Sequence, residues 1–335
     1  MTSRERFEKV LSFSRDVDRL PVVEWAPWWT KTLDAWYKEG LSEVPGDEHG
    51  LHEHFGLDRL HQFWFSGRDP DFDQAVANRG GLVSDENDYK ELKKYLYTQR
   101  IIDDGKSQIE KFLERYGEDG YATWMSLDGF FWYPRTLFGI ENHLYAFYDH
   151  PDLMKRMNEE VLEFYLRLIE MVYSYINPVF MTFAEDMSYN LGPMISEELY
   201  DEFMDPYFKV IIPEIKKHGT HPIIDTDGFV EPLIPWFLGS GIEGILPLER
   251  MAGVDVNRIR QNYPNLLMIG AFDKTVMHLG EEAMRKEFER IKPVILSGGY
   301  IPGVDHQTPP DVTVENYEIF LKLLREYCGM YGNNG

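Results

Sequence analysis

Cysteine and long hydrophobic runs are both nearly missing from this sequence. The 335 residues contain 1 cysteine, Cys328, which excludes an intramolecular disulfide and any metal site built from several thiolates. No apolar stretch approaches the roughly 20 residues that a membrane-spanning helix needs. No apolar signal core follows Met1 either. We therefore expect a soluble, cytoplasmic protein with no membrane partner.

Positive charge is scarce as well. Lys and Arg number 34 against 57 Asp and Glu, and the formal net charge at pH 7 is −23. Nucleic acids and anionic membranes are bound through surfaces rich in Lys and Arg, so the charge balance argues against both as main partners. No G-x-G-x-x-G or G-x-x-x-x-G-K-[ST] motif follows a predicted strand. A dinucleotide or P-loop site is therefore unsupported.

What the chain has in quantity is apolar and aromatic side chains, 43% and 15% of its residues. A large core is therefore expected. Short apolar runs alternate with helical patterns, and the predicted strands are 20–25, 121–126, 179–183, 222–224, 242–246, 266–270 and 294–296. Such alternation predicts a parallel sheet covered by helices. The number of units favours a single (β/α)8 TIM barrel over residues 1–335, with N-terminal helical insertions at about 30–115.

Acidic side chains follow strand after strand of the predicted barrel. They are Glu24, Asp128, Glu185, Asp186, Asp225, Asp227, Glu249, Asp273 and Asp305. Residues at the carboxyl ends of barrel strands surround one mouth, where the chemistry of these folds takes place. A single acid in such a place commonly caps a helix. Several acids together repel one another, and a metal ion, a cationic substrate, shared protons or basic side chains must relieve the repulsion.

Asp225 and Asp227 are the most suggestive acid pair. Residues i and i+2 of a strand face the same side, so both carboxylates could reach one ion. Together with His306 they form a mixed oxygen and nitrogen set that suits a divalent metal such as zinc. His306 is also a candidate proton donor, because its ordinary pKa lies close to neutrality. The alternatives are that His306 only hydrogen-bonds its turn and that the acids bind substrate or support the structure.

Aromatic side chains crowd the loops after the early strands. Trp25 and Trp132 either belong to the core or line a pocket for a flat apolar ligand. Arg135 follows this cluster and could pair with the acids or with a substrate carboxylate. The predicted substrate-binding residues are therefore Trp25, Trp132, Arg135, Glu185 and Asp186.

Three stretches, 2–22, 185–207 and 298–316, resemble the uroporphyrinogen decarboxylase superfamily. Their order and spread imply a (β/α)8 barrel with its site in the mouth. The superfamily combines decarboxylation of uroporphyrinogen without a cofactor and methyl transfer involving corrinoid proteins. The decarboxylase carries arginines after its first strand, where this chain has Glu24-Trp25-Ala26-Pro27-Trp28-Trp29. Asp69 and Asp71 are the candidates for its catalytic aspartate.

The methyltransferase branch carries zinc on a His-x-Cys pair and a late Cys. Asp225-x-Asp227 stands in place of that pair, and His306 or Val304 stands in place of the late Cys. This is a departure, because carboxylates are harder ligands than thiolates.

The expected function is methyl transfer from a small methoxylated or methylated substrate to a corrinoid protein. The corrinoid belongs to this partner, and a homodimer is compatible with the resemblance. His306, Asp227 and Glu249 are the expected catalytic residues. Two alternatives stay open: a decarboxylase of a small or tetrapyrrole carboxylic acid, with His306 and Arg135 on the carboxylate, and a non-catalytic binding barrel, which the loss of the thiol ligands permits.

Overall fold

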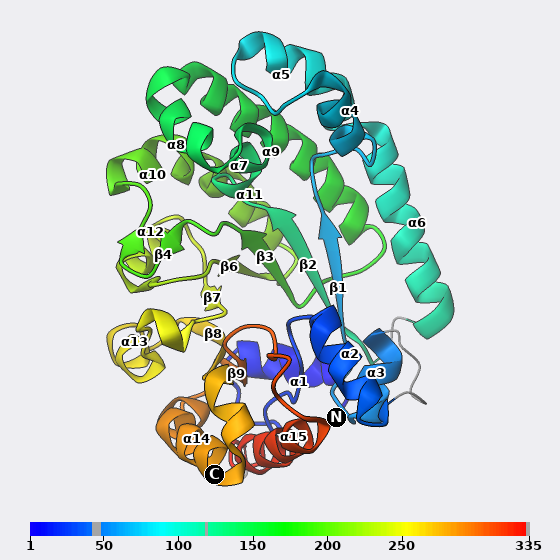
Figure 1. The fold of residues 1–335 in the computed structure, drawn as a ribbon, viewed down its shortest axis with the longest axis vertical. Coiled ribbons are helices and arrows are strands. Elements are labelled where there is room, and N and C mark those ends of the chain that lie inside the picture. The colour runs from blue at the N-terminus through cyan, green and yellow to red at the C-terminus, as the bar shows by residue number, and fades with distance from the viewer. Residues whose placement is uncertain (42–47, 118–119, 333–335) are drawn as a thin grey trace.

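A curled parallel sheet runs through the molecule (Figure 1). The computed structural model describes residues 1–41, 48–117 and 120–332. The strands of this sheet are β1 (Leu60–Phe65), β2 (Ala122–Asp128), β3 (Phe180–Ala184), β6 (His221–Asp225), β7 (Gly244–Leu246), β8 (Leu267–Phe272) and β9 (Tyr300–Val304). They pair in the order β1-β2-β3-β6-β7-β8-β9, always in parallel. Within the described ranges β1 and β9 do not pair, so the sheet is an open barrel and the predicted eight-stranded closure is wrong.

Helices connect these strands and cover the sheet. Before β1 lie α1 (Ser3–Leu11), α2 (Thr30–Lys38) and α3 (Glu48–His54); between β1 and β2 lie α4 (Phe72–Arg79), α5 (Glu86–Leu92) and α6 (Gln99–Tyr116). Between β2 and β3 lie α7 (Trp132–Phe138), α8 (Ile140–Asp149) and α9 (Pro151–Tyr173). The later helices are α10 (Glu197–Phe203), α11 (Asp205–Lys216), α12 (Ile234–Gly239), α13 (Val256–Asn262), α14 (Glu281–Ile295) and α15 (Val314–Cys328). A short hairpin of β4 (Ser188–Tyr189) and β5 (Gly192–Pro193) follows β3. None of the described helices has both the length and the apolarity to cross a membrane.

The prediction of a final strand at 294–296 is wrong. Val294 and Ile295 end α14, because they continue the buried face that Met284, Phe288 and Ile291 begin at helical spacing. A pair of glycines at 298 and 299 with positive φ then turns the chain into β9. A proline at position 302 is tolerated there, since β9 lies at the edge of the sheet.

The prediction of a first strand at 20–25 is also wrong, although the segment occupies the position of one. Trp25 Nε1 donates to Val304 O at 2.7 Å, and the Asp58 N–H donates to Val22 O at 2.8 Å. The segment therefore lies between the end of β9 and the start of β1. Pro21 deprives it of one ladder donor, and the described residues pair it with neither strand.

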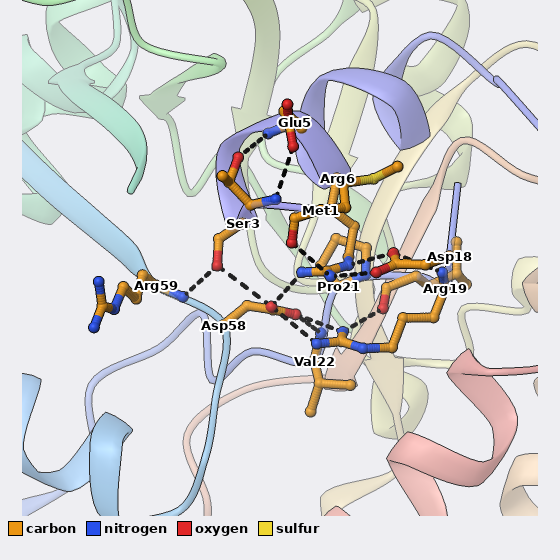
Figure 2. Close-up of polar contacts among 12 residues, drawn as sticks. Met1, Ser3, Glu5, Arg6, Asp18, Arg19, Pro21, Val22, Asp58 and Arg59 are labelled. Atoms are coloured by element: carbon orange, nitrogen blue, oxygen red, sulfur yellow. Dashed lines mark hydrogen bonds and ion pairs between the residues drawn. The ribbon is translucent and has the colours of Figure 1, made fainter. Parts of the chain in front are cut away.

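An ion network holds this segment in place (Figure 2). The buried Asp58 carboxylate accepts hydrogen bonds from Arg6 Nη1 at 2.5 Å and Arg19 Nη1 at 2.6 Å. It also accepts the Val22 N–H at 2.7 Å. Asp18 binds the other side of the Arg6 guanidinium at 2.7 Å. Side-chain ion pairs and hydrogen bonds thus hold this segment in place, as backbone hydrogen bonds between strands do elsewhere in the sheet.

The range 30–115 is mostly helical, as predicted, but it also contains β1. Part of it, 42–47, lies outside the described residues. The sequence of β1 is Leu-His-Gln-Phe-Trp-Phe, and its burial does not alternate regularly, with Trp64 49% exposed. An edge strand of this kind carries a weak period-2 signal, which explains why the pattern did not reveal it.

Candidate active site

Polar side chains lie where the carboxyl ends of the parallel strands meet. Hydrogen bonds join the segments that follow neighbouring strands. The Gly228 N–H donates to Glu249 Oε2 at 3.0 Å. The N–H groups of Arg250 and Lys274 donate to the two oxygens of Asp305, at 2.9 and 3.3 Å. The segments after β6, β7, β8 and β9 therefore form one continuous edge.

Acids dominate this edge, and we call the following set the acidic rim: Asp186, Asp225, Asp227, Glu249 and Asp305. Burial, and then repulsion from Glu249 and Asp186, raise the pKa of Asp227 to about 7. Burial, and then Asp186 and Asp227, raise the pKa of Asp225 well above its ordinary value. Burial raises the pKa of Asp305 to about 6, although Lys274 opposes it. Near neutral pH the acidic rim therefore holds bound protons.

A histidine and a lysine face the acidic rim. His306 Nε2 lies 3.7 Å from Asp227 Oδ2. Lys274 Nζ lies 3.7 Å from both Glu249 Oε1 and Asp305 Oδ1. Burial and the charge of Lys274 lower the pKa of His306, against the opposing effect of Glu249. A neutral imidazole therefore stands beside an acid that holds a proton, and such a pair can move a proton to or from a substrate.

Lys274 was not among the predicted site residues. Its position two residues after the end of β8, next to Asp273, was the available signal. What the sequence did not reveal is its pairing, because Glu249 and Asp305 come from segments far apart along the chain.

Glu185 anchors the loop that carries Trp132. Its fully buried carboxylate accepts the N–H groups of Phe130 and Phe131 at 2.8 Å and of Trp132 at 3.0 Å, at the start of α7. Gly129 makes room for it, because a Cβ there would lie 2.1 Å from the Glu185 carboxyl carbon. Burial raises the pKa of Glu185 to about 8, with the three amides opposing. The oxygens of Glu185 are thus taken up by the loop that carries Trp132.

Trp132 and Arg135 pack against each other next to the backbone of Asp186. The Arg135 guanidinium lies 4.9 Å from the centre of the Trp132 ring. Its Nη1 donates to the backbone oxygen of Asp186 at 3.0 Å. Trp25 lies on another part of the edge, where its indole packs against Gly303 and donates to Val304 O. Glu24, the neighbour of Trp25, points toward α15 instead, where the Tyr317 hydroxyl donates to it at 2.7 Å.

Backbone strain gathers at the same end of the sheet. Asp186, Leu248 and Ala271 have φ values of 41°, 67° and 71°. Residues other than glycine rarely adopt positive φ, and such conformations concentrate at functional sites. These three residues lie at or just beyond the carboxyl ends of β3, β7 and β8. The backbone therefore marks this end of the molecule independently of its charges.

The uroporphyrinogen decarboxylase (URO-D) family model matches residues 135–327, more than half of the chain. The chain belongs to the uroporphyrinogen decarboxylase family. The matched part runs from Arg135 through the acidic rim to α15, and the resemblance seen in the sequence is thereby confirmed.

Solved structures match this chain at low sequence identity. A methyltransferase from Methanosarcina mazei matches with a TM-score of 0.60 and 11% identity, covering 98% of this chain and 99% of its own. A candidate vitamin-B12-independent methionine synthase from Listeria monocytogenes matches with a TM-score of 0.46 and 13% identity, covering 93% and 97%. No curated protein sequence matches the chain significantly. At 11% identity, the similarity to the Methanosarcina mazei structure shows the fold alone.

The predicted zinc ligands do not form a coordination site in this family member. Within the described ranges, no three side chains of His, Cys, Asp or Glu are arranged to hold a metal ion. The expectation that Asp225 and Asp227 face the same side depends on a strand, and β6 ends at Asp225. Beyond it the chain turns, with the Thr226 hydroxyl accepting the Met187 N–H at 3.1 Å. The arrangement of the described residues therefore does not fit zinc.

Asp69 and Asp71, the candidates for the catalytic aspartate of the decarboxylase, are engaged elsewhere. Asp69 accepts the Thr98 hydroxyl at 2.7 Å and the Asp71 N–H at 3.1 Å. Arg100 donates to Asp71 Oδ2 at 2.9 Å. Ser66, which follows β1, instead donates to the carboxylate of Asp128 at the end of β2, at 2.6 Å.

Proposed function

We propose that this family member is a methyltransferase that takes a methyl group from a small methoxylated or methylated compound. The acceptor is the corrinoid of a partner protein, which acts as a second substrate and supplies the nucleophile when docked. The observation that carries the proposal is the pairing of His306 with Asp227 inside the acidic rim. The shared fold of a methyltransferase gives further support.

The chemistry required of this chain is proton delivery. When the bond between the methyl carbon and oxygen or nitrogen breaks, the leaving atom keeps the bonding pair and must receive a proton. Asp227 holds a proton near neutral pH, and His306 beside it can take up a proton from solvent and pass it to the Asp227 carboxylate once the first proton is spent. Glu249 and Lys274 set the charge around this pair.

Substrate binding falls to the aromatic and cationic side chains of the edge. Trp25 and the stacked pair of Trp132 and Arg135 offer flat surfaces for an aromatic or methylated group. Glu185 and Asp186 contribute by holding the loops that carry them. A substrate with many carboxylates would be repelled by the acidic rim, which argues against uroporphyrinogen itself.

The test uses purified protein, free cob(I)alamin as acceptor and a panel of methoxybenzenes and methylamines. Formation of methylcobalamin, followed by absorbance, is the expected result. Release of CO2 from carboxylic acids without cobalamin would replace the proposal by decarboxylation. Binding of a panel compound without turnover, unchanged in His306→Ala, would establish a non-catalytic barrel. Elemental analysis of the same protein tests the zinc hypothesis separately.

A further inference from the structure

A second polar cluster lies outside the acidic rim, between the segment 20–25 and α15. Glu24 is 4% exposed, and Tyr317 Oη donates to its Oε2 at 2.7 Å. The other carboxyl oxygen, Oε1, has no hydrogen-bond partner among the described residues. The same is true of the Thr308 hydroxyl and of Trp28 Nε1, which are also buried. Three unpaired polar atoms in one buried region require an explanation.

These polar groups act on one another. Tyr317 and Thr308 are the side chains that stabilise the charged form of Glu24, and burial outweighs both. Trp28 packs edge-on against the Tyr317 ring, with centroids 6.0 Å apart. His52 packs edge-on against Trp28 and is neutral at pH 7, because burial lowers its pKa to about 4. Hydroxyl groups and aromatic rings thus surround Glu24.

The polar cluster includes Thr308, which belongs to the loop that carries His306. Thr308 stands two residues beyond His306, and its backbone oxygen accepts the Thr32 hydroxyl at 2.9 Å. Trp36 Nε1 holds the same loop further on, at Val312 O, over 2.7 Å. Glu24 itself precedes Trp25 in the segment 20–25. Its side chain therefore extends from the segment that carries Trp25 toward Tyr317 and Thr308.

We propose that Glu24 is a positioning residue whose carboxyl group bridges Tyr317 and Thr308 and thereby fixes the His306 loop. Oε2 accepts the Tyr317 hydroxyl, and Oε1 shares a hydrogen bond with the Thr308 hydroxyl, which satisfies two of the unpaired atoms. The inference rests on the proposed function only in giving His306 a catalytic role. The bridge itself is a property of the fold.

Two substitutions of Glu24 separate the bridge from simple packing. Glu24→Gln keeps both roles, since its amide oxygen accepts from Tyr317 and its amide nitrogen donates to Thr308. Glu24→Ala removes both. In hydrogen–deuterium exchange of the full chain, amides of 305–313 should exchange about tenfold faster in the Ala variant, the size expected for one lost buried hydrogen bond. Glu24→Gln should match the wild type, and α9 should stay unchanged in both as an internal reference.

Thr308→Val provides an independent variant, which also decides the matter if Glu24→Ala fails to fold. It removes only the hydroxyl and should accelerate exchange of 305–313 to the same extent. Where Glu24→Ala folds, combining the two changes should add nothing more.

Three results would overturn the bridge: unchanged exchange of 305–313 in Thr308→Val, a Gln variant that behaves like the Ala variant, or acceleration that extends equally to α9. None of these measurements requires turnover. A chain that shows the loop effect but transfers no methyl group would sink the proposed function and leave the bridge standing.

Discussion

Asp227 carries the most specific chemical prediction at the scale of single residues. Asp227→Asn keeps the size of the side chain but removes the acidic proton. Positioned general acids contribute about 10² to 10⁴ in rate, so kcat for methyl transfer should fall by about 100-fold or more. Steady-state kinetics would measure this, with Asp201→Asn on the exposed surface of α10 as the matched control. An unchanged kcat in the Asp227 variant would remove this residue from the chemistry.

Lys274 gives a second prediction, on pH dependence. Its charge opposes the burial and the repulsion that raise the pKa of Asp227 to about 7. If protonated Asp227 is the active form, activity falls as the pH rises through that pKa. Lys274→Met removes the opposing charge, so the pKa of Asp227 rises and the alkaline limb of kcat moves to higher pH. A limb that moves to lower pH would contradict the assignment of Asp227 as the acid.

The segment 20–25 leads to a stability prediction at the scale of elements. Asp58 binds Arg6, Arg19 and the Val22 N–H from a nearly buried position. Breaking a buried ion pair by removing one partner costs about 3 to 5 kcal/mol, and part of Arg19 is exposed, so Asp58→Asn should lower the free energy of unfolding by about 3 kcal/mol. Denaturant unfolding measures this.

A matched control for Asp58 is available on the surface. Asp16 pairs with Lys9 but has a side chain that is 89% exposed, so Asp16→Asn should change the free energy of unfolding by less than about 1 kcal/mol. Equal effects of the two substitutions would show that the network does not hold the segment.

The strands illustrate what the sequence could predict. Strands β2, β3, β6, β7 and β8 are buried on both faces and read as short apolar runs, so their places were predicted to within a few residues. The apolar run at 294–296 has the same local appearance but completes the buried face of α14. A short run cannot by itself distinguish a strand from the end of a buried helix.

The candidate site, like the strands, could be predicted only in part from the sequence. That acids collect at one end was predictable, because parallel strands place their carboxyl ends together. The metal set was not, since the i, i+2 rule does not extend past the end of β6 at Asp225. The roles of Glu24 and Lys274 depend on Tyr317, Glu249 and Asp305, which only the tertiary fold brings near.

At the scale of the whole molecule, buried acids set the pH dependence of stability. Glu185 and Asp227 have folded pKa values of about 8 and 7, above their ordinary 4.5 and 3.8. The folded chain thus keeps protons that the unfolded chain has released, and this stability is lost as the pH rises from those ordinary values through the folded ones. Ion-paired surface acids such as Glu86, whose pKa is lowered to about 2, have the opposite effect below pH 4.5.

We therefore expect the melting temperature to be highest at about pH 5 and to fall toward about pH 8. Calorimetry at constant ionic strength measures this. A net charge of −23 adds repulsion in the same direction as the pH rises. A melting temperature that climbs steadily between these two pH values would show that the buried acids are ionised in the folded protein.

The open edge between β9 and β1 has a consequence for how this fold can change. A backbone ladder is made by groups that every sequence has, so few single substitutions other than one to proline remove its hydrogen bonds. Here a few side chains around Asp58 perform that task, and each of them can be changed by a single mutation. Trp25 lies in the segment that these side chains hold. Substitutions far from the acidic rim can therefore change the position of Trp25 while the sheet stays intact. The open edge between β9 and β1 is therefore a place where new substrate preferences can evolve.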